Sequence, residues 1–140
     1  MTTVEWLSRA RSLDSEITAL LTAQRRAFER VLNVTGRLRE IVVKGGLRQD
    51  PMERYLELEE TINERINELL EVKQEILAAI RNIDRQEYRV LLIDRYVNGY
   101  TWEKVAQHMH YSTKHVLSEM HPAALDAAQR VLEEESRRAG

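Results

Sequence analysis

The stretch DRQEYRVLLIDRYVNGYTWEKVAQHMHYSTKHVLSEMHPAAL occupies residues 84–125 and decides the fold, because it predicts three short helices joined by two tight turns. Gly99 favours the left-handed backbone conformation that follows the end of a helix. Thr101 and Ser112 belong to the residue types that cap helix starts, so they predict a second helix over 102–109 and a third directly after Ser112. Helix, tight turn and helix in this order form a helix-turn-helix motif.

The interior of this motif follows from apolar residues at helical spacing. Asp84 and Glu87 have the spacing of a capping box, which predicts that the first helix starts at Arg85. Trp102 is expected to pack on Tyr88, Leu92 and Val116, and Pro122 is expected to kink or end the third helix one residue earlier. The inward-facing positions are predicted to be Tyr88, Leu91, Leu92, Tyr96, Trp102, Val105, Ala106, Met109, Val116 and Met120.

This motif resembles the fourth region of sigma-70-type factors and the related phage regulators of the RinA and ArpU kind. The residues that carry the likeness are Tyr96, Gly99, Thr101, Trp102, Val105, Ala106, Ser112, Val116, Ala124 and Leu125. The order of an amino-terminal helix, a loop, a long glutamate-rich helix and RYVNGYTWEKVAQHMHYS (95–112) is also similar to a widespread phage family of unknown function. The resemblance implies binding of double-stranded DNA near promoters, in some members with direct contact to RNA polymerase.

The resemblance and the docking geometry of such motifs both place the start of the third helix in the major groove. Bases would then be contacted from Thr113, Lys114 and Ser118, where short hydroxyls and one lysine replace the longer side chains of sigma factors. Arg89, Lys104 and Lys114 lie near the three helix starts, where phosphate binding is favoured. The full set of expected DNA-binding residues is Arg89, Thr101, Lys104, Ser112, Thr113, Lys114, His115 and Ser118.

Charge and histidine content limit this prediction. Residues 84–140 contain eight Lys and Arg against nine Asp and Glu, so a single copy should bind duplex weakly unless its cations share one face. All four histidines lie within 108–121, on different faces of two expected helices, which favours solvated or phosphate-adjacent side chains over a metal site. We expect no metal and no cofactor.

Two long segments with heptad spacing precede the motif and predict an antiparallel helical hairpin. The strong break between them is KGGLRQDP, residues 44–51. Gly36 leaves two interpretations open: a continuous first helix, or a helix that ends there and leaves 37–50 as a longer connection. The expected seam of the first helix is Trp6, Ala10, Leu13, Ile17, Leu20, Gln24, Ala27, Val31, Val34, Leu38 and Ile41. That of the second helix is Met52, Tyr55, Glu59, Ile62, Ile66, Leu69, Lys73, Ile76, Ile80 and Ile83.

The hairpin contains more apolar residues than one seam uses. A second apolar face is indicated by Leu21, Phe28, Val42, Leu56, Leu70 and Leu77. Either the helix-turn-helix folds back onto this face or a second copy of the chain covers it, and a dimer is the favoured state. The polar seam residues Gln24, Glu59 and Lys73 either fix the register or mark an imperfect seam.

Composition sets the class of protein. The 140 residues include two prolines, five glycines and no cysteine, which favours an all-helical chain without disulfides or thiolate metal sites. No apolar run approaches the ~20 residues that span a bilayer, and early charges argue against a secretory signal, so we expect a protein of the bacterial cytosol. No phosphate-binding loop, zinc-protease motif or nucleophile motif is present, so we do not expect an enzyme.

The sequence therefore predicts an all-α protein. Residues 1–83 form a long antiparallel helical hairpin for oligomerisation or partner binding, and 84–140 form a sigma region-four-like helix-turn-helix with a tail helix over 123–136. The predicted function is that of a phage or prophage transcriptional regulator that binds double-stranded DNA. Two other classes stay open: a DNA-packaging adaptor of the small-terminase kind, and a protein-binding module that contacts RNA polymerase.

Overall fold

The computed structural model describes the backbone of residues 1–35 and 50–140, and the side chains of 1–33 and 50–140. The expected seam positions Val34, Leu38 and Ile41, the expected face residue Val42 and the choice left open by Gly36 lie outside this part. In the described part the chain is helical and contains no strand, so the all-α prediction is confirmed. No helix there is both long enough and apolar enough to cross a membrane.

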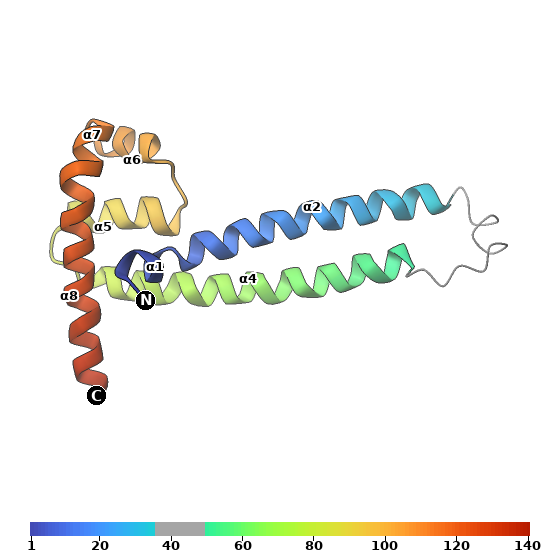
Figure 1. The fold of residues 1–140 in the computed structure, drawn as a ribbon, viewed down its shortest axis with the longest axis horizontal. Helices are drawn as coiled ribbons and strands as arrows, with labels where there is room; N and C mark the ends of the chain where they lie inside the picture. The colour runs from blue at the N-terminus through green and yellow to red at the C-terminus, as the bar shows by residue number, and fades with distance from the viewer. Residues whose placement is uncertain (36–49) are drawn as a thin grey trace. The chain divides into compact units, whose positions relative to one another are not determined.

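The elements are seven α-helices in the described part, with two π-helical turns, η1 and η2, inserted between them (Figure 1). Their bounds are α1 Thr3–Leu7, α2 Arg9–Thr35, α4 Pro51–Arg81, α5 Gln86–Leu92, η1 Ile93–Val97, α6 Trp102–Met109, α7 Thr113–His115, η2 Val116–Met120 and α8 His121–Ala139.

These elements form two compact units. Unit 1 consists of Met1–Ser12 and Leu69–Gly140, and unit 2 of Leu13–Glu68. The division differs from the expected boundary at residue 83, because the start of α2 and the end of α4 belong to the same unit as α5 to α8.

Local capping explains where two of the helices begin. Thr2 accepts a hydrogen bond from the Glu5 amide and the Glu5 carboxylate accepts one from the Thr2 amide, so a capping box starts α1. The Asp50 carboxylate accepts from the amide of Met52 at 3.1 Å, and Pro51 occupies the first position of α4, where its missing N–H costs nothing.

The expected capping box at Asp84 is wrong. The residue that precedes α5 is Arg85, in an extended conformation and without a side-chain cap, so the helix starts at Gln86. The turn before α5 is instead bonded to Arg89, whose Nη1 donates to the carbonyl oxygens of Ile83 (2.5 Å) and Asp84 (2.9 Å).

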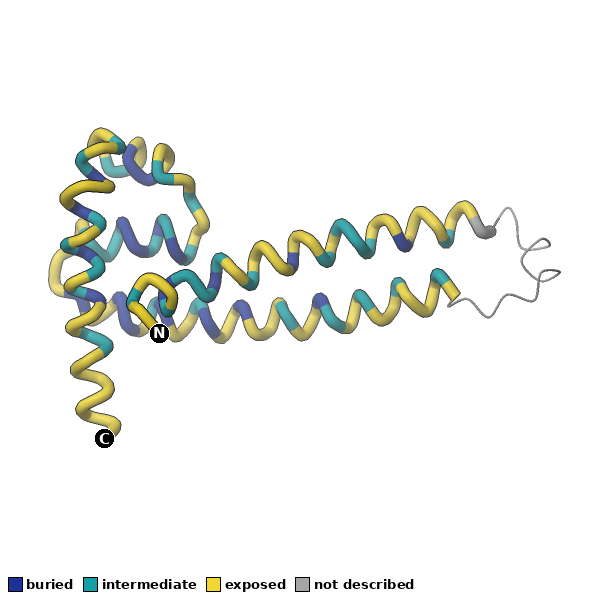
Figure 2. The backbone as a smooth tube through the Cα atoms, in the orientation of Figure 1, coloured by how far each residue is buried: buried dark blue, intermediate teal, exposed yellow. Residues whose placement is uncertain are grey.

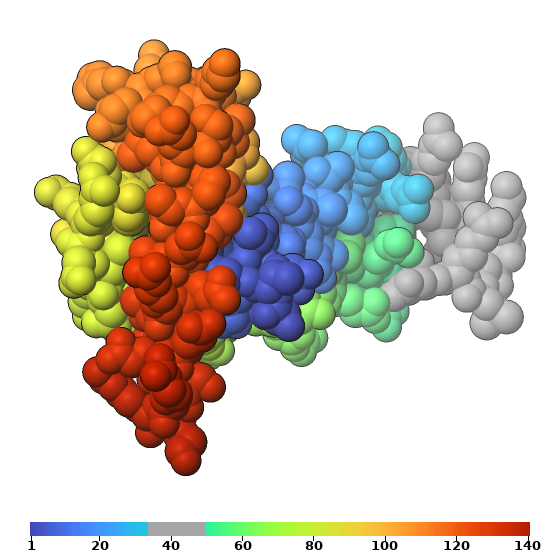
Figure 3. All heavy atoms as spheres, turned by 60° about the vertical axis from the view of Figure 1, so that its left-hand side comes forward, coloured from blue at the N-terminus to red at the C-terminus, as the bar shows by residue number. Residues whose placement is uncertain are grey.

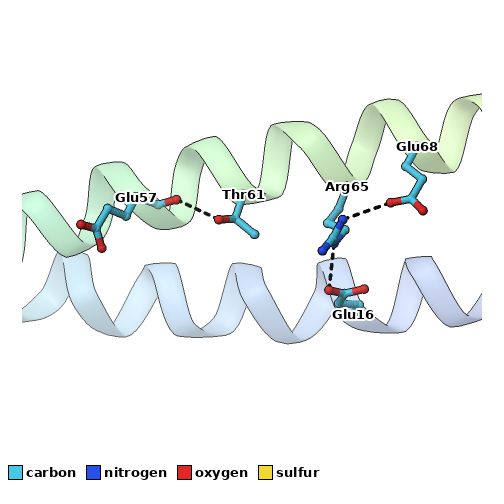
Figure 4. Close-up of polar contacts among 5 residues, drawn as sticks. All are labelled: Glu16, Glu57, Thr61, Arg65 and Glu68. Carbon is cyan, nitrogen blue, oxygen red and sulfur yellow. Dashed lines mark hydrogen bonds and ion pairs between the residues drawn. The ribbon is translucent and has the colours of Figure 1, made fainter.

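In unit 2, α2 and α4 run antiparallel. Glu16 accepts a hydrogen bond from Arg65 at 3.0 Å, and the ring of Phe28 lies 5.7 Å from that of Tyr55, so residue numbers fall along α4 as they rise along α2. Figure 4 shows Arg65 placed between Glu16 of α2 and Glu68 of its own helix.

The seam of α4 is only half as predicted. Every seventh residue from Tyr55 to Ile83 is buried or half-buried, as expected, and so are Lys73 and Ile80 of the alternate row. Met52, Glu59 and Ile66 of that row are exposed, so their prediction is wrong, and residues one position earlier, Leu58, Arg65 and Val72, are half-buried or buried. Burying the leucine at position 58 costs less than burying the neighbouring carboxylate of Glu59.

The core of unit 1 takes buried residues from each of its elements except α7. Its buried apolar residues are Leu7, Ala10, Leu69, Val72, Ile76, Ala79, Ile80, Ile83, Leu91, Leu92, Tyr96, Val105, Ala106, Val116, Met120, Ala124 and Ala128. Helix α8 continues directly from η2 and packs on α5 and on α1, and Figure 3 shows the spheres of α1 and α8 in direct contact. The part of unit 1 from α5 to α7 is thereby fixed against one long helix.

Pro122 does not end the third helix as expected. The backbone stays helical from Thr113 to Ala139, and the irregularity is the π-helical turn η2 directly before the proline. In a regular α-helix the proline ring would clash with the carbonyl of Ser118, four residues earlier. The wider turn at Val116–Met120 accommodates the ring without breaking the helix.

Candidate functional site

The connection between α6 and α7 is built by two side-chain caps. The Thr101 hydroxyl accepts from the Lys104 amide at 3.2 Å, and the Ser112 hydroxyl accepts from the His115 amide at 3.1 Å. Both caps were predicted and are confirmed. Between the helices His110 adopts the left-handed conformation at φ 63°, which allows a reversal of the chain within three residues.

The inner sides of these helices are as expected. Val105 and Ala106 of α6 are buried, as are Val116 and Met120 of η2, so α6 and the helix that begins at α7 and continues through η2 have a fixed orientation on the rest of unit 1. Trp102 and Met109, which were also expected to face inward, are half-buried.

The Trp102 ring lies between two polar groups. It is 4.5 Å from the Arg95 guanidinium carbon, and its centroid is 4.5 Å from that of the His121 ring. The Tyr96 hydroxyl and His121 Nε2 are 2.7 Å apart, and Arg95 donates to the Tyr100 carbonyl. Burial and the neighbouring Arg95 charge lower the pKa of His121, and burial raises the pKa of Tyr96. This polar cluster joins η1, α6 and α8.

A second polar link was not found from the sequence. Asp94 is 4% exposed, and its Oδ2 lies 2.5 Å from Nδ1 of His108. This pair therefore joins η1 to α6. Asp94 follows Leu91 by three residues, and this spacing alone indicated that it belongs to the buried stripe of the first helix.

The expected DNA-binding residues fall into three groups. Thr101 and Ser112 act as helix caps, and Arg89 is bonded to backbone carbonyls, so these three side chains have structural roles. His115 lies with its ring 4.9 Å from that of Tyr111 and with Nδ1 3.7 Å from Glu119. The third group consists of Lys104, Lys114 and Ser118, which are exposed, and Thr113, which is half-buried.

Lys114 and Ser118 share one side of the helix that begins at α7, because the Ser118 hydroxyl donates to the Lys114 carbonyl at 2.7 Å. Leu117 adds an apolar group next to them and is 41% exposed. Sequence reasoning missed it, although an apolar residue outside the buried stripe is itself a signal for a contact surface. We call Lys114, Leu117 and Ser118 the α7 face.

Lys104 lies at the start of α6, with its Nζ 4.1 Å from the centroid of the Tyr100 ring. Neither Lys104 nor Lys114 forms an ion pair within residues 1–33 and 50–140. Both ammonium groups are therefore available to an anionic partner such as a phosphate.

Comparison of the chain with protein-family models, with curated proteins and with solved structures finds no match. The function has to be argued from the residues and the geometry.

Proposed function

We propose that α5, η1, α6 and α7 form a helix-turn-helix that binds double-stranded DNA, and that the chain is a transcriptional regulator of the phage type. The observation that carries this proposal is the α7 face. It lies at the capped start of a helix whose opposite side is buried through Val116 and Met120. A fixed helix with an exposed, capped first turn is what insertion into a major groove requires.

Each residue of the α7 face matches a group of the duplex. The Lys114 ammonium can donate to a phosphate or to the acceptor edge of guanine, and Ser118 can accept from or donate to a base edge. Leu117 can contact the methyl group of thymine. Lys104 supplies a second cation for the phosphates beside the groove.

Electrostatics predicts that this binding is weak for one copy. Because residues 84–140 have eight cationic and nine anionic side chains, attraction to duplex comes from the placement of Lys104 and Lys114 and not from net charge. The slope of affinity against salt should accordingly be shallow.

A second candidate is a protein-binding module that contacts RNA polymerase. Tyr111 and Leu117, 40% and 41% exposed, favour it because they give the start of α7 an apolar character. A packaging adaptor of the small-terminase kind is a third possibility, and it predicts rings of many copies in solution, whereas the regulator predicts a dimer.

The test is binding of the full chain to fluorescent duplexes, one of random sequence and one from the DNA upstream of its own gene, at about 50 and about 200 mM salt. We expect Lys104→Ala and Lys114→Ala each to weaken binding and to flatten the salt slope by about one unit if they hold phosphates. Arg54→Ala is the control, since Arg54 is an exposed cation of α4 outside the motif.

If the parent chain shows no salt-dependent binding to either duplex, the DNA-binding proposal fails and the protein-binding candidate replaces it. If Arg54→Ala weakens binding as much as Lys114→Ala does, the interface does not lie at α7.

A further inference from the structure

Unit 2 exposes a row of large apolar side chains that nothing in this unit covers. Each of them is between 37% and 58% exposed, and Figure 2 shows exposed turns, in yellow, along both helices. They are Leu21, Phe28 and Leu32 on α2, and Met52, Leu56 and Ile66 on α4.

Helix geometry places both sets on one face. At about 100° per residue, the three residues of α2 lie 60–100° to one side of its buried line through Ile17 and Ala27. The three residues of α4 lie to the same rotational side of its buried line through Ile62 and Leu69, at roughly 50–130°. In an antiparallel pair, offsets of the same rotational sense point to the same face of the pair.

Two contacts support this assignment independently. Phe28 of the apolar row touches Tyr55 across the pair, as expected if both lie toward the same face. Glu16 and Arg65 have offsets of the opposite sense, and they meet each other on the opposite side (Figure 4). The side of unit 2 that carries the row is named the apolar face below.

The apolar face also carries one cation and one anion at nearly the same height. Arg25 lies among the apolar residues of α2, and Glu59 lies among those of α4. Because Phe28 is level with Tyr55, Arg25 is level with residue 58, which is within one residue, or ~1.5 Å of helix rise, of Glu59. Neither forms an ion pair among the described side chains.

We propose that a second copy of this chain covers the apolar face, with α2 of each copy packed on α4 of the other. A two-fold axis parallel to the helices brings the two faces together and leaves every height unchanged. Arg25 then meets Glu59 of the second copy, and the symmetry forms this pair twice. The product is a four-helix bundle in which every neighbouring helix is antiparallel.

Charge selects this arrangement over the alternative with like helices in contact. Residues 51–68 of α4 carry six glutamates and two arginines, so packing α4 on α4 would bring two anionic helices together. Packing α4 on α2 instead faces Glu59 with Arg25. The inference does not depend on DNA binding, because it uses only unit 2.

The first test measures the mass of the full chain in solution by light scattering or sedimentation over a range of concentrations. We expect a dimer, and we expect Phe28→Glu and Leu56→Glu each to raise its dissociation constant by about a hundredfold or more, since a carboxylate is then buried among apolar groups. Ala19→Glu is the matched control: Ala19 is exposed on α2, but on the side away from the apolar face, and the dimer should be unchanged. Circular dichroism establishes that each variant is folded.

The second test exchanges the charges. Arg25→Glu and Glu59→Arg should each raise the dissociation constant by about tenfold, and the double variant should restore the parent value within about threefold. If a different protein covered the apolar face, the double charge exchange would not restore its binding. A monomeric parent, a multimer unaffected by Phe28→Glu and Leu56→Glu, or a double variant weaker than either single one would each overturn the proposal.

Discussion

Replacing Trp102 by alanine tests how the helices around the candidate site are held together. The indole contacts Arg95 of η1 and His121 of α8 from its position at the start of α6, so one side chain joins three elements. Truncation of a fully buried aromatic residue costs about 3–5 kcal/mol. Because Trp102 is half-buried, we expect about half of that from packing, and the lost contact with Arg95 adds about 0.5–1 kcal/mol.

The expected loss for Trp102→Ala is therefore about 2–3.5 kcal/mol of unfolding free energy, which corresponds to a fall of roughly 8–28 °C in melting temperature for a unit of this size. Urea unfolding followed by circular dichroism measures it. Trp102→Phe is the control, since it keeps a smaller ring between Arg95 and His121 and should lose less than the alanine variant.

An alanine variant that unfolds within about 0.5 kcal/mol of the parent would refute this reasoning, because surface substitutions typically stay within that range. The indole would then be a surface group, and α6 would have to be rotated relative to η1 and α8.

Two further predictions concern single side chains of unit 1. Burial and Arg95 lower the pKa of His121 from its ordinary 6.5, so the folded state holds this ring neutral and the unfolded state protonates first as the pH falls. The unfolding free energy should thus be retained above about pH 6.5, and below that pH it should fall by less than about 1.4 kcal/mol per pH unit. Urea unfolding at several pH values measures this fall. A His121→Phe variant that shows the same fall would contradict the prediction. Gly99 and His110 both have left-handed backbones, at φ 74° and 63°, so Gly99→Ala should lower the unfolding free energy by about 1 kcal/mol and His110→Gly should raise it slightly. Thermal melting distinguishes them, and equal shifts in one direction would show that backbone conformation is not the cause.

The parts of the candidate site that were predictable are local ones. Thr101 and Ser112 each cap a helix through an amide three residues later, and such an interaction depends on little beyond the sequence around it. Asp84 had the same local signal, yet α5 starts one residue later, at Gln86, and has no side-chain cap. The carbonyls of Ile83 and Asp84 accept from Arg89, a contact that the local capping pattern does not contain.

Contacts between residues far apart in the chain could not be predicted, because they leave no pattern in the sequence. The pair of Asp94 and His108 spans fourteen positions, and neither residue type at its place indicates the other. The alternate seam row of α4 failed for a different reason: Leu58 and Glu59 both fit a spacing of three and four, and only packing against α2 selects Leu58. Periodicity identified the helices, both rows of the described α2 seam and one row of the α4 seam, while the first part of the second α4 row required the partner helix.

Because of the π-helical turn at Val116–Met120, the packing of unit 1 depends on the number of residues in that turn. Val116, Met120, Ala124 and Ala128 are all buried although they are spaced by four, a spacing that in a regular helix drifts by about 40° at each step. The wider turn cancels much of this drift and keeps the first and last of them on one line. Removing one residue from this turn would leave a continuous helix but rotate Ala124 and Ala128 by about 100° relative to Val116. Natural variants of this protein should therefore change residues freely at the exposed positions of the turn, and keep their number.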